Sequence, residues 1–171
     1  FPPLTQALSQ LLGAPSTTPE PSVTFEAPIP LPSEPTFLFT DIEGSTKLWE
    51  QYRDAMQLAL AQHDTIVRSA IQKNNGQVFK TIGDAFCAVF TSPATALQAA
   101  HTAQRAIAAL VVADTPLKVR MALHTGESER REGDFFGATL NRVARLLAVG
   151  HGGQVLLSQT TRVQLQEGIF V

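Results

Sequence analysis

The sequence has one cysteine, no long apolar run and almost no charge imbalance, and each of these shortages excludes a class of protein. The single cysteine, Cys87, excludes an internal disulfide and a multi-cysteine metal site. No apolar stretch approaches the roughly 18 residues that a membrane helix needs, and no basic segment leads into an apolar one as in a signal peptide. A net charge of −2 argues against broad electrostatic binding to nucleic acid or anionic membranes. We therefore expect a cytoplasmic domain that binds no nucleic acid and makes no membrane contact through this segment.

The sequence does contain enough apolar material for one core. Hydrophobic residues make up 44% of the 171 residues and charged residues 16%, which indicates a single domain and excludes wholesale disorder. Nine of the eleven prolines precede Thr36. We therefore predict a proline-rich linker over residues 1–35, in which the leucine spacing allows a short helix over 4–12, and a folded domain over residues 36–171. Because the first residue is not methionine, we interpret the sequence as a piece of a longer protein and expect further regulatory domains outside it.

From residue 36 onward, the hydrophobic pattern is regular and switches between the periods of strands and helices. The order strand, helix, strand, strand, helix, strand predicts an α+β fold with a ferredoxin-like βαββαβ core and extra strands. The first helical stretch is predicted to break near Arg53. The predicted strands cover residues 37–39, 77–82, 85–90, 117–124, 127–136 and 155–158, and the predicted helices cover 45–74, 93–110 and 137–149.

Two aspartates, Asp41 and Asp84, follow strands of this pattern. In a ferredoxin-like sheet the third strand lies between the first two and runs antiparallel to both. The end of the first strand therefore meets the turn between the second and third, and the two aspartates should lie on neighbouring strands about 5 Å apart. Alone, each aspartate reads as a capping or turn residue. Together, beside a helix N-terminus at Gly44, Ser45 and Thr46, they favour a Mg²⁺ site that serves phosphate groups.

Three other polar residues carry weak signals when each is taken alone. Lys80 lies within a predicted strand, where a lysine usually keeps its ammonium group in water. Asn141 and Arg145 are four positions apart and therefore share one helix face. This face adjoins the apolar stripe of the helix, so the two side chains either line a cleft or are simply solvated. The predicted stripe consists of Leu140, Val143, Ala144 and Leu147.

Three segments match the motifs of one known family in order and spacing. They are FLFTDIEGST at residues 37–46, FKTIGDAF at 79–86 and DFFGATLNRVARL at 134–146. By these motifs residues 36–165 resemble the catalytic domain of the class III nucleotidyl cyclases, which include the adenylyl and guanylyl cyclases. Domains of that family usually continue into a strand pair that carries a phosphate-binding lysine. The resemblance therefore implies a cyclase-like fold that lacks its C-terminal strands.

The resemblance also implies the roles of the matching residues. Asp41 and Asp84, together with the carbonyl of Ile42, resemble the ligands of two Mg²⁺ or Mn²⁺ ions. Lys80 and Asp134 resemble the pair that selects the purine base. A lysine donor and a carboxylate acceptor complement the edge of adenine, whereas guanine offers the reverse pattern. The implied substrate is therefore ATP.

On the predicted third helix, Asn141 resembles the ribose-orienting residue of the family and Arg145 resembles its transition-state arginine. Arg131 is a further candidate for a phosphate contact. The implied reaction is in-line attack of the ribose 3′-oxygen on the α-phosphorus of ATP, giving 3′,5′-cyclic AMP and pyrophosphate. Because one strand and its turn carry both Lys80 and Asp84, we expect a homodimer in which two chains share each site.

Two other functions stay open at this point. One is a non-catalytic cyclase-like module for dimerisation or nucleotide sensing, and the other is a guanylate cyclase, against which Lys80 and Asp134 argue. The remaining candidate residues are interpreted as structural. Cys87 is assigned to the core, and Trp49 and Tyr52 are assigned to packing or a dimer contact. The histidines show no metal-site spacing and are interpreted as surface or satisfied core residues: His63, His101, His124 and His151.

Overall fold

The computed structural model describes residues 29–110 and 117–168. The short helix considered for residues 4–12 and most of the proline-rich segment lie outside the described residues. The division between linker and domain at residue 35 therefore stays a prediction. Within the described part of the chain, no helix combines the length and the hydrophobicity that crossing a bilayer requires.

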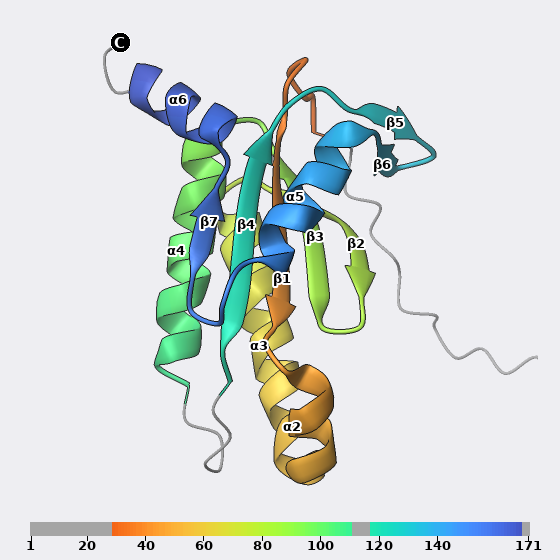
Figure 1. Ribbon diagram of the computed structural model, residues 1–171, viewed down its shortest axis with the longest axis vertical. Coiled ribbons are helices and arrows are strands. Elements are labelled where there is room, and N and C mark those ends of the chain that lie inside the picture. The colour runs from red at the N-terminus through yellow and green to blue at the C-terminus, as the bar shows by residue number, and fades with distance from the viewer. Residues whose placement is uncertain (1–28, 111–116, 169–171) are drawn as a thin grey trace, which may run out of the picture.

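A five-stranded sheet forms the centre of the molecule (Figure 1). Strand β3 lies between β1 and β2 and is antiparallel to both, and β4 pairs with the other side of β1. This is the order that the ferredoxin-like pattern predicts, so the predicted fold class is confirmed. From one edge to the other, the strands are β2 (Gln77–Ile82), β3 (Ala85–Phe90), β1 (Thr36–Ile42), β4 (Val119–Thr125) and β7 (Val155–Leu157).

Helices cover both faces of this sheet. Helices α3 and α4 pack on one face, while α5 crosses the other (Figure 1). A short helix, α2, precedes α3, and the two are separated at Tyr52, one residue from the predicted break. The helices are α2 (Ser45–Gln51), α3 (Arg53–Lys73), α4 (Pro93–Ala108), α5 (Ala138–Ala148) and α6 (Gln159–Glu167).

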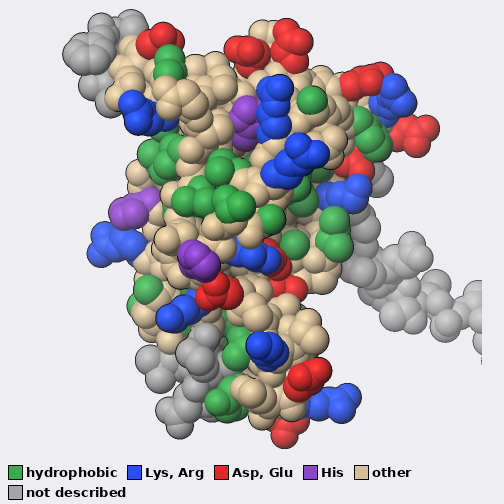
Figure 2. Space-filling view, viewed as in Figure 1, with side chains coloured by type: hydrophobic (Ala, Val, Ile, Leu, Met, Phe, Trp, Pro, Cys, Tyr) green, Lys and Arg blue, Asp and Glu red, His purple; other side chains and the backbone are tan. Residues whose placement is uncertain are grey.

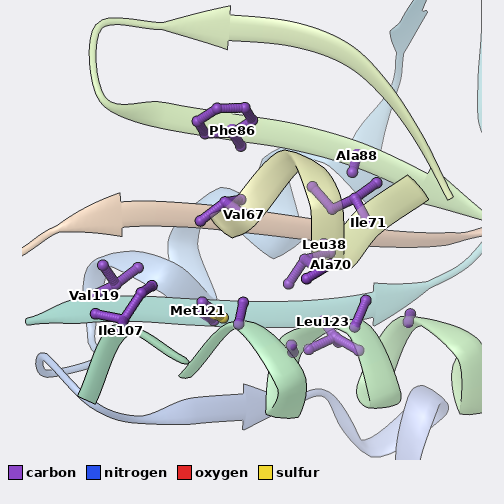
Figure 3. Packing of buried hydrophobic residues seen from close by; sticks show 14 of the residues in the cluster. Leu38, Val67, Ala70, Ile71, Phe86, Ala88, Ile107, Val119, Met121 and Leu123 are labelled. Atoms are coloured by element: carbon purple, nitrogen blue, oxygen red, sulfur yellow. The ribbon is translucent and has the colours of Figure 1, made fainter. Parts of the chain in front are cut away.

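Two hydrophobic clusters lie on opposite faces of the sheet, because successive strand residues point to opposite sides. Leu38 belongs to the cluster under α3 and α4, where it packs with residues such as Ile71 and Met121 (Figure 3). Its neighbour Phe37 belongs to the second cluster, with Val143 of α5. Burying a side chain of this size contributes about 1.5–3 kcal/mol. The two clusters thus hold the sheet between its helices.

The segment predicted as one strand over residues 127–136 is a hairpin instead. It consists of β5 (Glu129–Arg131) and β6 (Asp134–Phe136), which form a separate two-stranded sheet. Glu132 and Gly133 have φ angles of 50° and 84°, so both adopt the left-handed conformation of a tight hairpin turn. Glutamate is not typical of that position, which is why the sequence pattern hid the turn.

Two further differences concern the end of the chain. Helix α6 was not predicted, although Ser158 caps it by accepting a hydrogen bond from the backbone N–H of Thr161 at 3.3 Å. Within α5, Ala144 is exposed, and the half-buried Leu146 packs against the second cluster in its place. The predicted stripe of α5 was therefore wrong at one of its four positions.

Candidate active site

The two aspartates lie together at one end of the sheet, as the strand order predicts. Asp84, in the turn between β2 and β3, accepts a hydrogen bond at Oδ2 from the backbone N–H of Ile42 at 2.9 Å. Its Oδ1 accepts a second hydrogen bond from the Ser45 hydroxyl at 3.3 Å. Asp41 is the residue before Ile42 in β1. We call the end of the sheet formed by Asp41, Ile42 and Asp84 the carboxylate edge.

The chain turns from β1 into α2 directly beside this edge. Gly44 has a φ angle of 68°, a conformation that favours glycine. Ser45 is engaged with Asp84, and Thr46 is exposed on the first turn of α2. The structure therefore brings Ser45 to the carboxylate edge, whereas a phosphate contact for Gly44, Ser45 and Thr46 stays a prediction.

An arginine that the sequence interpretation missed lies against Asp41. Arg120 of β4 donates from Nε and Nη2 to Asp41 Oδ2, at 3.0 and 2.5 Å. The two residues are direct partners in the antiparallel ladder between β1 and β4. Once the strand order is assumed, this pairing register is the signal that could have found Arg120. The arginine supplies a positive charge at an edge that otherwise carries two carboxylates.

The donor atoms at the carboxylate edge fit Mg²⁺ or Mn²⁺. Two carboxylates and the Ile42 carbonyl are hard oxygen ligands, and Mg²⁺ usually takes one or two carboxylates together with water and substrate phosphates. No group of three or more His, Cys, Asp or Glu side chains suited to a metal occurs among residues 29–110 and 117–168. A cation at this edge would therefore need further ligands, such as water or phosphate oxygens.

Lys80 and Asp134 form an ion pair within one chain. The ladder register of β2 shifts between Val78 and Lys80, which marks a bulge. In a regular strand, Phe79 and Lys80 would point to opposite faces. The bulge re-aims the strand, so that Phe79 packs in the cluster under α5 while Lys80 reaches Asp134 on β6. Two residues that are 54 positions apart in sequence are thereby joined.

Both members of this pair are held in their charged forms. The hydrogen bond to Asp134, together with its negative charge, raises the pKa of Lys80. The hydrogen bond from Lys80 lowers the pKa of Asp134, and the backbone N–H of Phe135, which donates to Asp134 Oδ1 at 2.8 Å, lowers it further. At neutral pH the pair therefore offers an ammonium donor beside a carboxylate acceptor. Cys87, opposite Lys80 in the ladder, stays a thiol because burial raises its pKa to about 11.

Asn141 and Arg145 share the exposed face of α5. On the opposite side of the same helix, Val143 is buried and Leu147 is half-buried against the sheet. The two polar side chains therefore project away from their own sheet and toward solvent. Figure 2 views this side of the molecule, where several Lys and Arg side chains are exposed among hydrophobic ones. The structure does not bring Asn141 and Arg145 to the carboxylate edge of the same chain.

Arg131 lies on the β5–β6 hairpin and is largely exposed. Its guanidinium makes two hydrogen bonds, each of 2.7 Å, to the carboxylate of Glu129. This pairing within the hairpin does not bring Arg131 to the carboxylate edge. A phosphate contact for Arg131 stays a prediction.

Two of the four histidines differ from the prediction that the ring nitrogens of buried histidines have hydrogen-bond partners. His63 and His124 are buried, and each has one partner, Asp64 and Ser158 respectively, at Nδ1. Neither Nε2 atom has a hydrogen-bond partner among the described residues. Burial, with a smaller effect from the charge of Arg142, lowers the pKa of His124, so this histidine is neutral at pH 7.

Comparisons with known proteins agree on one family. Residues 32–171 match the model of the adenylate and guanylate cyclase catalytic domain. An uncharacterised protein of Mycobacterium tuberculosis is 40% identical over 128 residues, which make up 74% of this chain and 43% of that protein. An adenylate cyclase of Neurospora crassa is 33% identical over 162 residues, which make up 77% of this chain and 7% of that protein. The chain thus spans less than half the length of these curated relatives.

The fold is also similar to that of a solved protein. A structure of adenylate cyclases from Trypanosoma brucei in their monomeric state matches with a TM-score of 0.68 and 28% sequence identity. The match covers 82% of this chain and 83% of that one. The shared architecture thus extends over most of both chains.

Proposed function

Because the chain belongs to the family of adenylate and guanylate cyclase catalytic domains, we propose that it is the catalytic domain of an adenylate cyclase, which converts ATP into 3′,5′-cyclic AMP and pyrophosphate. The observation that supports ATP rather than GTP as the substrate is the charged Lys80–Asp134 pair. Lysine donates to the adenine ring nitrogen, and the carboxylate accepts from the exocyclic amino group. Guanine would place a donor against lysine and a carbonyl against the carboxylate, so the pair disfavours GTP.

The carboxylate edge holds the metal ions in this proposal. Asp41, Asp84 and the Ile42 carbonyl would bind two Mg²⁺ or Mn²⁺ ions. When bound, such ions supply Lewis-acid activation of the ribose 3′-hydroxyl and neutralise charge on the phosphates. The hydrogen bond from Ile42 N–H fixes the Asp84 carboxylate toward the end of β1. Arg120 adds a fixed cation beside Asp41, close to where the polyphosphate would lie.

The geometry of a single chain supports a site shared between two chains. The hairpin with Asp134 and the turn with Asp84 lie toward opposite ends of the sheet (Figure 1). Asn141 and Arg145 point away from that sheet into solvent. In a two-fold homodimer, the carboxylate edge of one chain would face α5 of the other, and each nucleotide would lie between them. Arg145 would then stabilise charge that develops on the α-phosphate.

The proposal is tested by incubating the protein with ATP or GTP, with Mg²⁺ or Mn²⁺, and identifying the product by mass. Cyclic AMP formed in preference to cyclic GMP is the expected result. A preference for cyclic GMP would identify a guanylate cyclase and overturn the role of the Lys80–Asp134 pair. If no cyclic nucleotide forms under any of these conditions, but ATP still binds, the non-catalytic module becomes the better description.

A further inference from the structure

Three aromatic rings lie beside the Lys80–Asp134 pair. We call Phe37, Phe79 and Phe135 the aromatic cluster. The ring of Phe79 meets that of Phe135 edge to face, with centroids 4.8 Å apart, and Phe37 contacts both rings at 6.0 and 5.2 Å. Phe79 is the residue before Lys80, and Phe135 is the residue after Asp134. The backbone that carries each charged side chain is therefore anchored by the ring next to it.

These ring contacts help to hold the β5–β6 hairpin against the domain. Strands β5 and β6 pair only with each other and not with the five-stranded sheet. The buried ring of Phe135 connects the hairpin to the cluster under α5. Arg130 covers the same ring, with its guanidinium carbon 5.6 Å from the ring centroid. No ladder hydrogen bonds tie β6 to β2. Among the described residues the two strands are joined by side chains, through the Phe79–Phe135 contact and the Lys80–Asp134 pair itself.

A segment before β1 packs on the same cluster. Leu31 is half-buried against the residues under α5, and it lines a hollow together with Phe135 and Arg130. Several prolines of the segment line the hollow as well. Proline restricts φ, so this part of the chain loses little conformational entropy when it is held in one path. The segment thus contacts the hairpin at Phe135 and Arg130.

We propose that Phe79, Phe135 and Leu31 are positioning residues that set the geometry of the Lys80–Asp134 pair, and that residues 29–35 bear directly on purine selection through this packing. The inference rests on the proposed function in so far as the pair reads the base of the nucleotide. None of the three side chains needs to touch the nucleotide. Their effect is to hold donor and acceptor at the spacing that adenine requires.

The first test uses the titration of Asp134, which needs no catalytic activity. Three variants, Phe135→Leu, Phe79→Leu and Leu31→Ala, are compared with the wild type by NMR titration of the Asp134 carboxyl carbon. Loosening the pair weakens the hydrogen bond from Lys80, so the pKa of Asp134 should rise toward its ordinary value of about 3.9. The variant Lys80→Met gives the limiting rise for a pair that is lost altogether.

The second test measures kcat/KM for ATP and for GTP in the same variants. A misplaced pair should lower the ratio of ATP to GTP by roughly tenfold, because small displacements of positioning groups have effects of about this size or larger. The matched control is Leu60→Ala. Leu60 is also half-buried, but it packs in the cluster on the other face of the sheet. It should lower the melting temperature without changing the ratio or the Asp134 titration.

The outcomes separate this inference from the proposed function. If the wild type makes no cyclic nucleotide, the proposed function fails, and the Asp134 titration alone decides the positioning role. An unchanged Asp134 pKa in folded Phe135→Leu and Phe79→Leu would overturn the inference. An equal shift in Leu60→Ala would overturn it too, because the effect would then reflect general loosening. If Phe135→Leu does not fold, the Asp134 pKa in Phe79→Leu and Leu31→Ala decides whether the inference holds.

Discussion

The carboxylate edge and the Lys80–Asp134 pair are built by different means within one sheet. At the edge, the aspartates are held by a backbone N–H of the first strand and by an arginine directly across a β ladder. The Lys80–Asp134 pair instead joins the edge strand β2 to the separate β5–β6 hairpin, and aromatic rings of the strand and the hairpin pack together. Hydrogen bonds to the strands β1 and β4 fix the carboxylates of the first group, whereas side-chain packing positions the second. Substitutions at the carboxylate edge should therefore almost abolish activity, whereas substitutions around the Lys80–Asp134 pair should change nucleotide preference in smaller steps.

The largest effect is expected from removing a carboxylate at the edge. Asp41→Ala should lower cyclic AMP formation by at least about 10²–10³, as loss of a group that stabilises transition-state charge does. The fold should survive, because Asp41 lies at the end of β1 and not in either cluster. Product mass and circular dichroism measure the two properties. A variant that unfolds would show that the carboxylate edge is structural.

For Asp84 the matched pair is Asp84→Ala and Asp84→Asn. Asparagine can still accept the hydrogen bond from Ile42 through its amide oxygen, but it lacks the negative charge that binds metal. Both variants should be inactive. Asp84→Ala should lose more thermal stability than Asp84→Asn, by about 1 kcal/mol for the hydrogen bond from Ile42 that only asparagine keeps. Residual activity in Asp84→Asn near the wild-type level would remove Asp84 from the metal site.

The next largest effect is a partial recovery of activity on mixing two inactive variants, Asp41→Ala and Arg145→Ala. In a mixed dimer one site collects both defects and the other site is intact. With random pairing, half of the dimers are mixed and half of their sites work, so about a quarter of the wild-type activity should return. Subunit exchange is checked by light scattering and differential tagging. Exchange without recovery would mean that each chain carries a complete site or that the two chains do not assemble productively.

A smaller, graded effect is expected at the pair. The double variant Lys80→Glu with Asp134→Cys replaces the donor with an acceptor and removes the carboxylate. ATP should lose its advantage over GTP by roughly tenfold to a hundredfold, since one well-formed pair of base contacts discriminates by about 1–3 kcal/mol. Competition assays with both nucleotides measure the change. An unaltered preference would remove Lys80 and Asp134 from the purine site.

The sequence predicted the carboxylate edge better than the pair's surroundings, for a physical reason. The order of elements alone fixes which strands neighbour each other, and this brings Asp84 to the end of β1. Arg120 was missed because its importance depends on the residue-by-residue register of β1 and β4, which the order of elements does not specify. The hairpin was missed because its turn uses Glu132, which carries no turn signal. The packing of Leu31 depends on tertiary contacts that no local pattern records.

The smallest expected effect is a difference in melting temperature between two truncations of the proline-rich segment. Composition alone predicts that removing residues 1–32 changes stability little, because a proline-rich linker contributes little core. Leu31, however, packs on the cluster beside Phe135. By the same argument from composition, removing residues 1–28 should leave the melting temperature nearly unchanged. Removing residues 1–32 should lower it by about 2–4 °C, the equivalent of about 1 kcal/mol for a partly buried leucine in a domain of this size. Calorimetry of both truncations tests this. Equal melting temperatures would mean that Leu31 contributes no packing energy, and the pair would then be held from the hairpin and β2 alone.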